Sequence, residues 1–227
     1  MCGRFTLTVR PDDIKRRFRI DDADHARMEE LPRYNIAPTQ RVPIVIQQEK
    51  KRKLVPMRWG LIPHWAKDSS FGSRLINARS ETVSQKPAFR RAFQRARCLV
   101  PADGFFEWKK SESGNKEPMR ITMKHGTLFA FAGLWEKWMD ATGNAVYSFT
   151  ILTTHPNEKM RRLHHRMPVI LKESDEWIWL DPTIHDPGVL HSLLSPCESE
   201  DIEMYPVSTV VNSPKNDGPE CIRPLAL

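Results

Sequence analysis

The amino-acid sequence predicts an α+β fold in which a mostly antiparallel β core, barrel-like or made of two packed sheets, carries peripheral helices. Strand-like segments rich in branched and aromatic residues dominate the middle of the 227-residue chain. The helical candidates are short, and they do not alternate regularly with strands as they would in a parallel βαβ sheet. Proline is frequent (18 residues) and glycine sparse (10 residues), which favours rigid turns between short elements.

The expected elements follow in chain order. A strand is expected over residues 5–9. Pro11-Asp12-Asp13 then opens a short amphipathic helix that runs to Phe18, because proline and acidic residues favour the first helical turn. Further strands are expected over residues 41–47, 53–59, 98–100, 105–108, 119–123, 128–135, 146–153 and 167–171. Helices are expected over residues 87–95, 156–163, 174–180 and 187–194.

The composition bounds the class of protein. Hydrophobic residues make up 40% and charged residues 28% of the chain, as in globular proteins. No apolar run approaches the ~18–20 residues of a membrane-spanning helix, and the N-terminus lacks the apolar segment of a secretory signal. We therefore expect one soluble domain over residues 1–227, without a membrane partner and located in the cytoplasm.

The net charge of +7 favours a polyanionic partner, because neutralising phosphates releases condensed counterions. The chain contains no GxxxxGK[ST], GxGxxG, HExxH or GxSxG motif, which argues against nucleotide-driven, zincin and α/β-hydrolase chemistry. Its cysteines show no CxxC pair or zinc-site spacing, so most are interpreted as small core hydrophobes. Cys2 is the exception, since the second position of a chain is rarely core.

Cys2 follows Met1 directly, and Met aminopeptidases generally remove Met ahead of a small residue. The freed α-amino group would have a pKa of ~7.7–8.0, so a useful fraction is neutral near pH ~7.5. A neutral amine attacks an aldehyde to form a Schiff base, and the neighbouring thiol can then close a thiazolidine ring. Alternatively, the amine can act as a base toward the thiol, as in N-terminal hydrolases and glutamine amidotransferases.

Other segments gather polar, chemistry-capable residues in β-like surroundings: Arg33-Tyr34-Asn35-Ile36-Ala37-Pro38-Thr39, Leu75-Ile76-Asn77-Ala78-Arg79-Ser80-Glu81, Pro101-Ala102-Asp103-Gly104-Phe105-Phe106-Glu107-Trp108 and His164-His165-Arg166-Met167-Pro168. With Met1-Cys2-Gly3-Arg4-Phe5 in front, this ordered set resembles the SOS response-associated peptidase (SRAP) family, which shields abasic sites by covalent crosslinking. The resemblance includes Trp59-Gly60-Leu61-Ile62-Pro63, Pro206-Val207-Ser208 and Asn212-Ser213-Pro214-Lys215-Asn216, and runs to about Glu220.

The resemblance implies four catalytic residues. Cys2 is the crosslinking nucleophile, and Asn77 holds the Cys2 backbone and the linked sugar. Glu107 manages the proton of the Cys2 amine, for which it must be partly desolvated. His164 is the functional histidine, and its pKa of ~6.5 suits protonation of the ribose ring oxygen as the sugar opens. In the family this segment reads His-Asp-Arg-Met-Pro, so His165 replaces an aspartate. His165 is the alternative to His164 as the catalytic histidine.

DNA-binding residues are implied as well. Each of the three best phosphate candidates lies within two residues of a proposed catalytic residue, and these candidates are Arg4, Arg79 and Arg166. Trp65 and Pro38 resemble the family's base-stacking wedge, and Asn35 matches the family pocket. By contrast, we interpret Arg90, Arg91, Arg95 and Arg97 as the solvated face of a helix, and the basic run over residues 50–53 as a charged hairpin tip.

The sequence thus predicts an abasic-site sensor that acts on single-stranded DNA as a monomer, with no metal and no organic cofactor. It would associate with the nucleoid when bound to DNA. Autocatalytic removal of Met1 and strand cleavage by β-elimination are expected side activities. Two alternatives stay open: a thiol amidohydrolase or peptidase that uses Cys2, and a noncatalytic single-strand binder that uses arginine and tryptophan alone.

Overall fold

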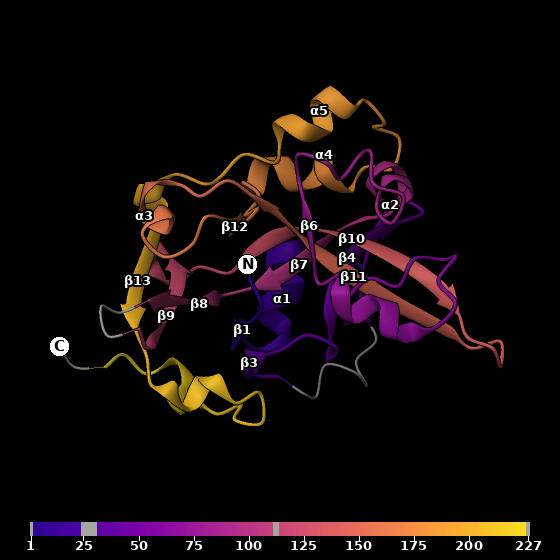
Figure 1. Ribbon diagram of the computed structural model, residues 1–227. Helices are drawn as coiled ribbons and strands as arrows, with labels where there is room; N and C mark the ends of the chain where they lie inside the picture. The colour runs from indigo at the N-terminus through magenta and orange to yellow at the C-terminus, as the bar shows by residue number, and fades with distance from the viewer. Residues whose placement is uncertain (1, 24–30, 111–113, 226–227) are drawn as a thin grey trace.

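The computed structural model describes residues 2–23, 31–110 and 114–225. Its larger sheet has the strand order β12-β11-β10-β7-β4-β5-β2, and β11 also pairs with β5. This extra pairing closes β4, β5, β11, β10 and β7 into a barrel (Figure 1). The strands are β2 (Asp22–Ala23), β4 (Arg41–Gln48), β5 (Lys51–Trp59), β7 (Arg97–Ala102), β10 (Phe129–Met139), β11 (Ala145–Thr154) and β12 (Met167–Pro168), and β6 (Asn77–Arg79) pairs with β11.

Close packing of strands shapes the barrel at Gly133 of β10. A Cβ atom at this position would lie 2.8 Å from the Cys98 sulfur of β7 and 2.9 Å from a Val100 methyl. Any larger residue would therefore push β10 away from its neighbours. The interior holds buried aromatic rings, and Trp59 of β5 stacks on Phe149 of β11 with ring centroids 6.3 Å apart.

A second sheet of five strands packs on the barrel in the order β13-β9-β8-β1-β3. Its strands are β1 (Phe5–Leu7), β3 (Arg33–Ile36), β8 (Gly104–Lys110), β9 (Lys116–Met123) and β13 (Ile202–Pro206). Phe5 of β1 joins the two sheets, because its ring packs edge-on against Trp59 at 5.1 Å and Phe131 at 6.0 Å. One hydrophobic core therefore fixes the N-terminal strand against the barrel.

The helices are short and peripheral: α1 (Pro11–Phe18), α2 (Arg90–Arg95), α3 (Glu158–Arg161), α4 (Glu176–Leu180) and α5 (Pro187–Ser192). Figure 1 shows α2, α4 and α5 grouped at one end of the barrel, while α3 lies beside β13. Phe93 of α2 contacts both Trp179 of α4 and His191 of α5, with ring centroids 6.0 and 5.0 Å apart. Within the described ranges, no helix is long and apolar enough to cross a membrane.

The predicted α+β class with an antiparallel core and peripheral helices is confirmed, and both a barrel and a second packed sheet are present. The helix from Pro11 to Phe18 has the expected bounds. The other helices are shorter than expected. The strand expected over residues 167–171 contains only Met167 and Pro168, after which a single bridge joins Ile170 to Phe131. The strands β2, β3, β6 and β13 were not expected; they are short and carry polar residues.

Arg97 contradicts the expectation of a solvated arginine face. Its side chain is buried, and it donates hydrogen bonds to the carbonyls of Trp179 at 2.6 Å, Phe93 at 2.9 Å and Ile184 at 3.0 Å. Burial lowers its pKa to about 10. A guanidinium with five donors can satisfy several carbonyls at once, which a periodicity argument does not detect. The basic run lies at a hairpin as expected, but only Lys50 is in the exposed turn, together with Glu49. The other three residues of the run begin β5, and the Arg52 side chain donates to the Phe18 carbonyl at 3.0 Å.

Candidate active site

Strand pairing places Cys2 beside Glu107. β1 runs antiparallel to β8 with Phe5 opposite Phe105, and the Phe106 amide donates a 3.0 Å hydrogen bond to the Arg4 carbonyl. Continuing this register sets Glu107 opposite Gly3, one residue from Cys2. The Cys2 thiol itself donates to the Arg4 carbonyl at 3.7 Å. The two residues are far apart in sequence and adjacent in the sheet.

Cys2 is fully buried and belongs to the main core, so the expectation that position two lies outside the core is wrong. Burial, followed by the negative charge of Glu107, raises the pKa of the Cys2 thiol far above its ordinary value. The thiol therefore stays protonated at neutral pH.

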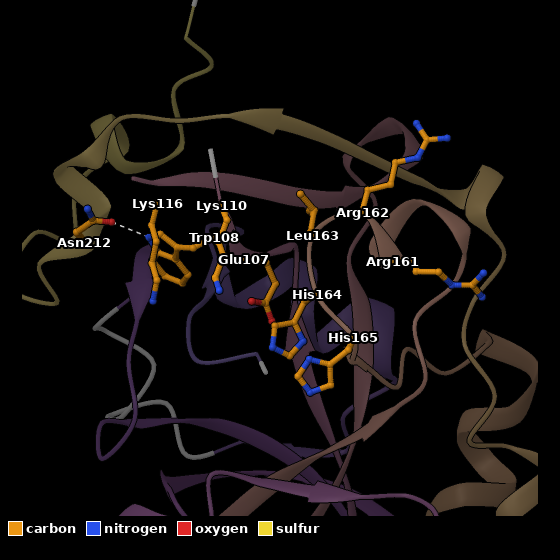
Figure 2. A pocket seen from close by; sticks show the side chains of 10 residues that line it. All are labelled: Glu107, Trp108, Lys110, Lys116, Arg161, Arg162, Leu163, His164, His165 and Asn212. Atoms are coloured by element: carbon orange, nitrogen blue, oxygen red, sulfur yellow. Dashed lines mark hydrogen bonds between the residues drawn. The ribbon is translucent and has the colours of Figure 1, made fainter. Parts of the chain in front are cut away.

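Glu107 lies on a cavity of about 850 Å³ whose wall also includes Trp108, His164 and His165. Figure 2 shows its carboxylate pointing toward the His164 imidazole. The side chain is only 4% exposed, which meets the requirement that it be desolvated. Its charge acts on both the Cys2 thiol and the His164 ring. Glu107 therefore links the buried cysteine to the open side of the cavity.

His164 follows the short helix α3, and its backbone amide closes the last turn on the Met160 carbonyl at 2.9 Å. Its Nδ1 lies 3.0 Å from the Arg166 amide and 3.1 Å from the Arg166 carbonyl. Either tautomer of the ring thus has a backbone partner that orients it. Burial lowers the pKa of His164, an effect that the Glu107 carboxylate opposes. The structure therefore brings Cys2, Glu107 and His164 together.

His165 lines the same cavity and is exposed to solvent. Its ring stacks on that of His164 with centroids 4.2 Å apart and planes inclined by 26°. The Arg166 backbone, rather than a side chain at position 165, holds Nδ1 of His164. In this chain the backbone of Arg166 therefore orients the His164 ring on its Nδ1 side.

Asn77 lies on β6 opposite Ile151 of β11. It does not line the cavity of Glu107; it lines a second cavity of about 530 Å³ with Trp65, Phe71 and Arg79. Both polar atoms of its amide are buried, and neither has a hydrogen-bond partner in the part of the chain described here. Such a group costs free energy unless a ligand engages it. Contact with Cys2 and the linked sugar stays a prediction.

Arg4 and Asn35 hold the C-terminal segment. Arg4 donates to Asn35 Oδ1 and to the Val211 carbonyl, both at 2.8 Å. The Asn35 amide in turn donates to the carbonyls of Ser213 at 3.0 Å and Asn216 at 2.7 Å. These bonds give both residues a structural role, and contact with DNA stays a prediction for each.

The remaining predicted DNA ligands differ in exposure. Arg166 forms a bidentate ion pair with Glu81 and is largely buried, so it ties the His164 segment to the residues after β6. Arg79 is exposed and forms no ion pair with any described residue. Trp65 is 48% exposed, and its ring meets Phe71 edge-on at 5.3 Å. Pro38 is half-buried.

Similarity to known proteins agrees with this geometry. A family model described as SOS response associated peptidase (SRAP) matches residues 1–214. The chain belongs to the SRAP family. Among its curated relatives, the abasic site processing protein YoqW of Bacillus subtilis is 50% identical over 222 residues, which cover 98% of this chain and 99% of that protein.

More distant relatives share the whole SRAP fold. The abasic site processing protein HMCES of Xenopus tropicalis is 32% identical over 272 aligned residues, which cover 100% of this chain and 79% of that protein. A crystal structure of a protein from Bacteroides thetaiotaomicron superposes with a TM-score of 0.89 at 27% identity, over 99% of this chain and 100% of the other. In the described residues, no cluster of three His, Cys, Asp or Glu side chains could hold a metal ion.

The sequence analysis missed a set of basic residues on the wall of the Glu107 cavity: Lys110, Lys116, Arg161 and Arg162. The arginines form an adjacent pair just before His164, and that pair was a usable signal. The lysines lie on different strands, and no sequence pattern states that they face each other.

Proposed function

We propose that this SRAP protein processes abasic sites in single-stranded DNA by forming a thiazolidine crosslink through Cys2 once Met1 has been removed. The observation that carries the proposal is the buried Glu107, whose charge acts on the buried Cys2 and on His164, a residue that lines the same cavity as Glu107. Relatives named for abasic site processing, at 50% and 32% identity, support the choice of substrate.

The chemistry proceeds in two bond-forming steps. The neutral α-amine of Cys2 attacks C1′ of the ring-opened sugar, and loss of one water gives an imine. The Cys2 sulfur then adds to the imine carbon, and the thiol proton passes to the nitrogen as the five-membered ring closes. The raised thiol pKa favours this order, since the amine is the better nucleophile until the imine has formed.

Glu107 and His164 divide the proton transfers. Glu107 lies beside the residue that carries the amine, where it can take a proton from the nitrogen and return one to the departing hydroxyl. His164 protonates the ring oxygen of the sugar in this proposal, which opens the ring to its aldehyde. Burial lowers the pKa of His164, so its protonated form is a stronger acid than an exposed imidazolium.

Removal of Met1 is the first requirement, because the Cys2 nitrogen is an amide while Met1 is present. Glu107 can serve as the base for a water that hydrolyses the Met1–Cys2 bond, which would make the protein a peptidase toward itself. The imine also acidifies the 2′ protons of the sugar, so β-elimination and strand cleavage form the expected lyase side reaction. We propose that one chain suffices and that it works in the cytoplasm on nucleoid DNA.

The decisive test is incubation of the purified protein with a single-stranded oligonucleotide that contains one abasic site, followed by denaturing electrophoresis. A denaturation-resistant band of combined mass is expected, and intact mass spectrometry should show the protein without Met1. A noncatalytic binder would shift the oligonucleotide only in a native gel. A thiol amidohydrolase would leave no crosslink and would turn over a glutamine-like amide.

A further inference from the structure

Two pairs of basic side chains flank the groups that carry the proposed chemistry. Lys110 and Lys116 line the cavity of about 850 Å³ on one side, and Arg161 and Arg162 line it on the other. Figure 2 shows Glu107, His164 and His165 between the two pairs. The lysines come from the β8–β9 hairpin and the arginines from the end of α3, so two independent elements supply the charge.

The lysine pair sets two positive charges directly opposite each other. Lys110 of β8 and Lys116 of β9 are direct cross-strand partners, and like charges in that position destabilise a sheet. The preceding pair shows the favourable alternative, because Lys109 lies opposite Glu117. Neither Lys110 nor Lys116 forms an ion pair with a residue of the described ranges.

The arginine pair is also available to a ligand. Arg161 and Arg162 are adjacent in sequence and exposed at the end of α3. Arg162 has one carboxylate nearby, that of Glu158 at 4.0 Å, and the side chains of Arg162 and Glu158 are both more than three-quarters exposed. An exposed ion pair of this kind contributes little free energy, so Glu158 competes weakly with a phosphate for Arg162. The carboxylate inside the cavity is Glu107, which leaves the rim strongly positive.

We propose that the lysine pair and the arginine pair bind the phosphodiester backbone of one DNA strand on the two sides of the abasic nucleotide. The strand would enter over one pair, place the sugar above Glu107 and His164, and leave over the other. This inference rests on the proposed function for the identity of the nucleotide in the middle. The binding of an undamaged strand does not depend on that chemistry.

The first experiment measures noncovalent affinity for a fluorescent, undamaged single-stranded oligonucleotide across a range of salt concentrations. Lys110→Gln/Lys116→Gln and Arg161→Gln/Arg162→Gln should each reduce the slope of log K against log salt by about 0.7–1.4, the value for one or two phosphates. The matched control is Lys50→Gln/Lys51→Gln at the β4–β5 hairpin tip, which removes the same net charge and should keep the wild-type slope.

The second experiment uses oligonucleotides with neutral methylphosphonate linkages over two nucleotides, placed either 5′ or 3′ of a central position. If the strand crosses the cavity, each basic pair contacts only one of the two blocks. Substituting the lysine pair should then not weaken binding further when its block is neutral, and substituting the arginine pair should not weaken binding further when the other block is neutral. Either polarity supports the proposal. Coupling of both pairs to the same block, or of neither pair to any block, overturns it.

The outcomes separate this inference from the proposed function. If both cavity variants keep the wild-type salt slope, or if the hairpin-tip control loses as much slope as they do, the rim is not a phosphate site, whatever the crosslinking assay shows. If wild-type protein forms no crosslink but the cavity variants lose slope selectively, the chemistry is wrong and the binding site stands.

Discussion

The cavity that holds Glu107 and the cavity that holds Asn77 differ in chemistry. The cavity of about 850 Å³ holds a buried carboxylate, two stacked imidazoles and a basic rim. The cavity of about 530 Å³ is lined mainly by apolar side chains, among them Trp65, Phe71 and Phe89. Its polar lining residues are Asn77, Arg79, Thr82 and Lys86. The Arg166–Glu81 ion pair connects the segment of the first cavity to that of the second.

This difference assigns separate tasks to the two cavities. A histidine that moves protons has its pKa adjusted by its surroundings, and His164, whose pKa is lowered by burial, lies in the first cavity. Apolar walls with a single exposed aromatic ring suit a stacked base, and that arrangement is found in the second. Substitutions of His164 in the first cavity should therefore change reaction rates, and substitutions of Trp65 in the second should change affinity.

The largest effect is expected for Cys2→Ala. This variant retains an N-terminal amine, so it can form an imine that borohydride traps, but it cannot close a thiazolidine. We expect complete loss of the crosslink that survives denaturation, with noncovalent binding unchanged. Denaturing gels with and without borohydride measure both products.

The matched controls for this change are the other cysteines. Cys98→Ala, Cys197→Ala and Cys221→Ala should each keep the crosslink, although the buried positions will cost stability. If one of these variants loses the crosslink while it remains folded, a different thiol is the nucleophile.

His164→Ala should give the next largest effect, a loss of about 10²–10⁴-fold in the rate of crosslinking. The same group assists ring closure when the adduct hydrolyses, so release should slow equally and the final yield should change little. A time course of formation, followed by a chase with unlabelled abasic DNA, measures both rates. His165→Ala should have only a mild effect, and a larger loss there in both phases would exchange the two roles.

The pH dependence sharpens the assignment of His164. The amine must be neutral, with a pKa of ~7.7–8.0 or higher beside Glu107, while His164 must be protonated and has a pKa lowered by burial below its usual ~6.5. Between these values, the two fractions change in opposite directions, so the wild-type rate should be nearly independent of pH. Without His164, the rate should rise about tenfold per pH unit over the same interval.

Binding changes in the second cavity should be smaller. Trp65→Ala is expected to weaken noncovalent binding by ~1–3 kcal/mol without changing the salt dependence, because it removes stacking and no charge. Arg79→Ala should instead reduce the salt slope by about 0.7, the value for one phosphate on a single strand. Equal changes in slope for the two variants would contradict the separation of stacking from charge.

Trp138→Phe should give the smallest effect. The Trp138 indole donates a 2.8 Å hydrogen bond to the Ala66 carbonyl, next to Trp65, and its ring packs with Ile62. Loss of this bond should cost about 1 kcal/mol and lower Tm by roughly 2–4 °C. Crosslinking should keep its rate, since the first cavity is untouched. Thermal unfolding and the gel time course test the two expectations.

Much of the fold could be predicted because local patterns carry it. The helix from Pro11 to Phe18 has a first-turn proline and acids, and most strands show branched and aromatic residues. The short strand β6 could not be found in this way, since its three residues include Asn77 and Arg79. Its existence depends on pairing with β11, which is a tertiary property.

The site shows the same division. Cys2, Glu107 and His164 could be named from their segments, and the structure gathers them. Burial could not be inferred for Cys2, because the apolar surroundings of an N-terminal residue come from distant strands. The cross-strand pairing of Lys110 with Lys116 could not be predicted from the sequence either, because the register of two strands is set by the whole sheet.

The attachment of Arg4 and Asn35 to the C-terminal segment has a consequence for synthesis. Arg4 is hydrogen-bonded to Val211, 207 residues further along, so the segment that carries Cys2 is translated long before the segment that holds Arg4. A nascent or truncated chain that stops before Val211 lacks the carbonyls that hold Arg4 and the Asn35 amide. The segment that carries Cys2 therefore gains these hydrogen bonds only after Val211 has been made, and chains that stop earlier carry Cys2 without them.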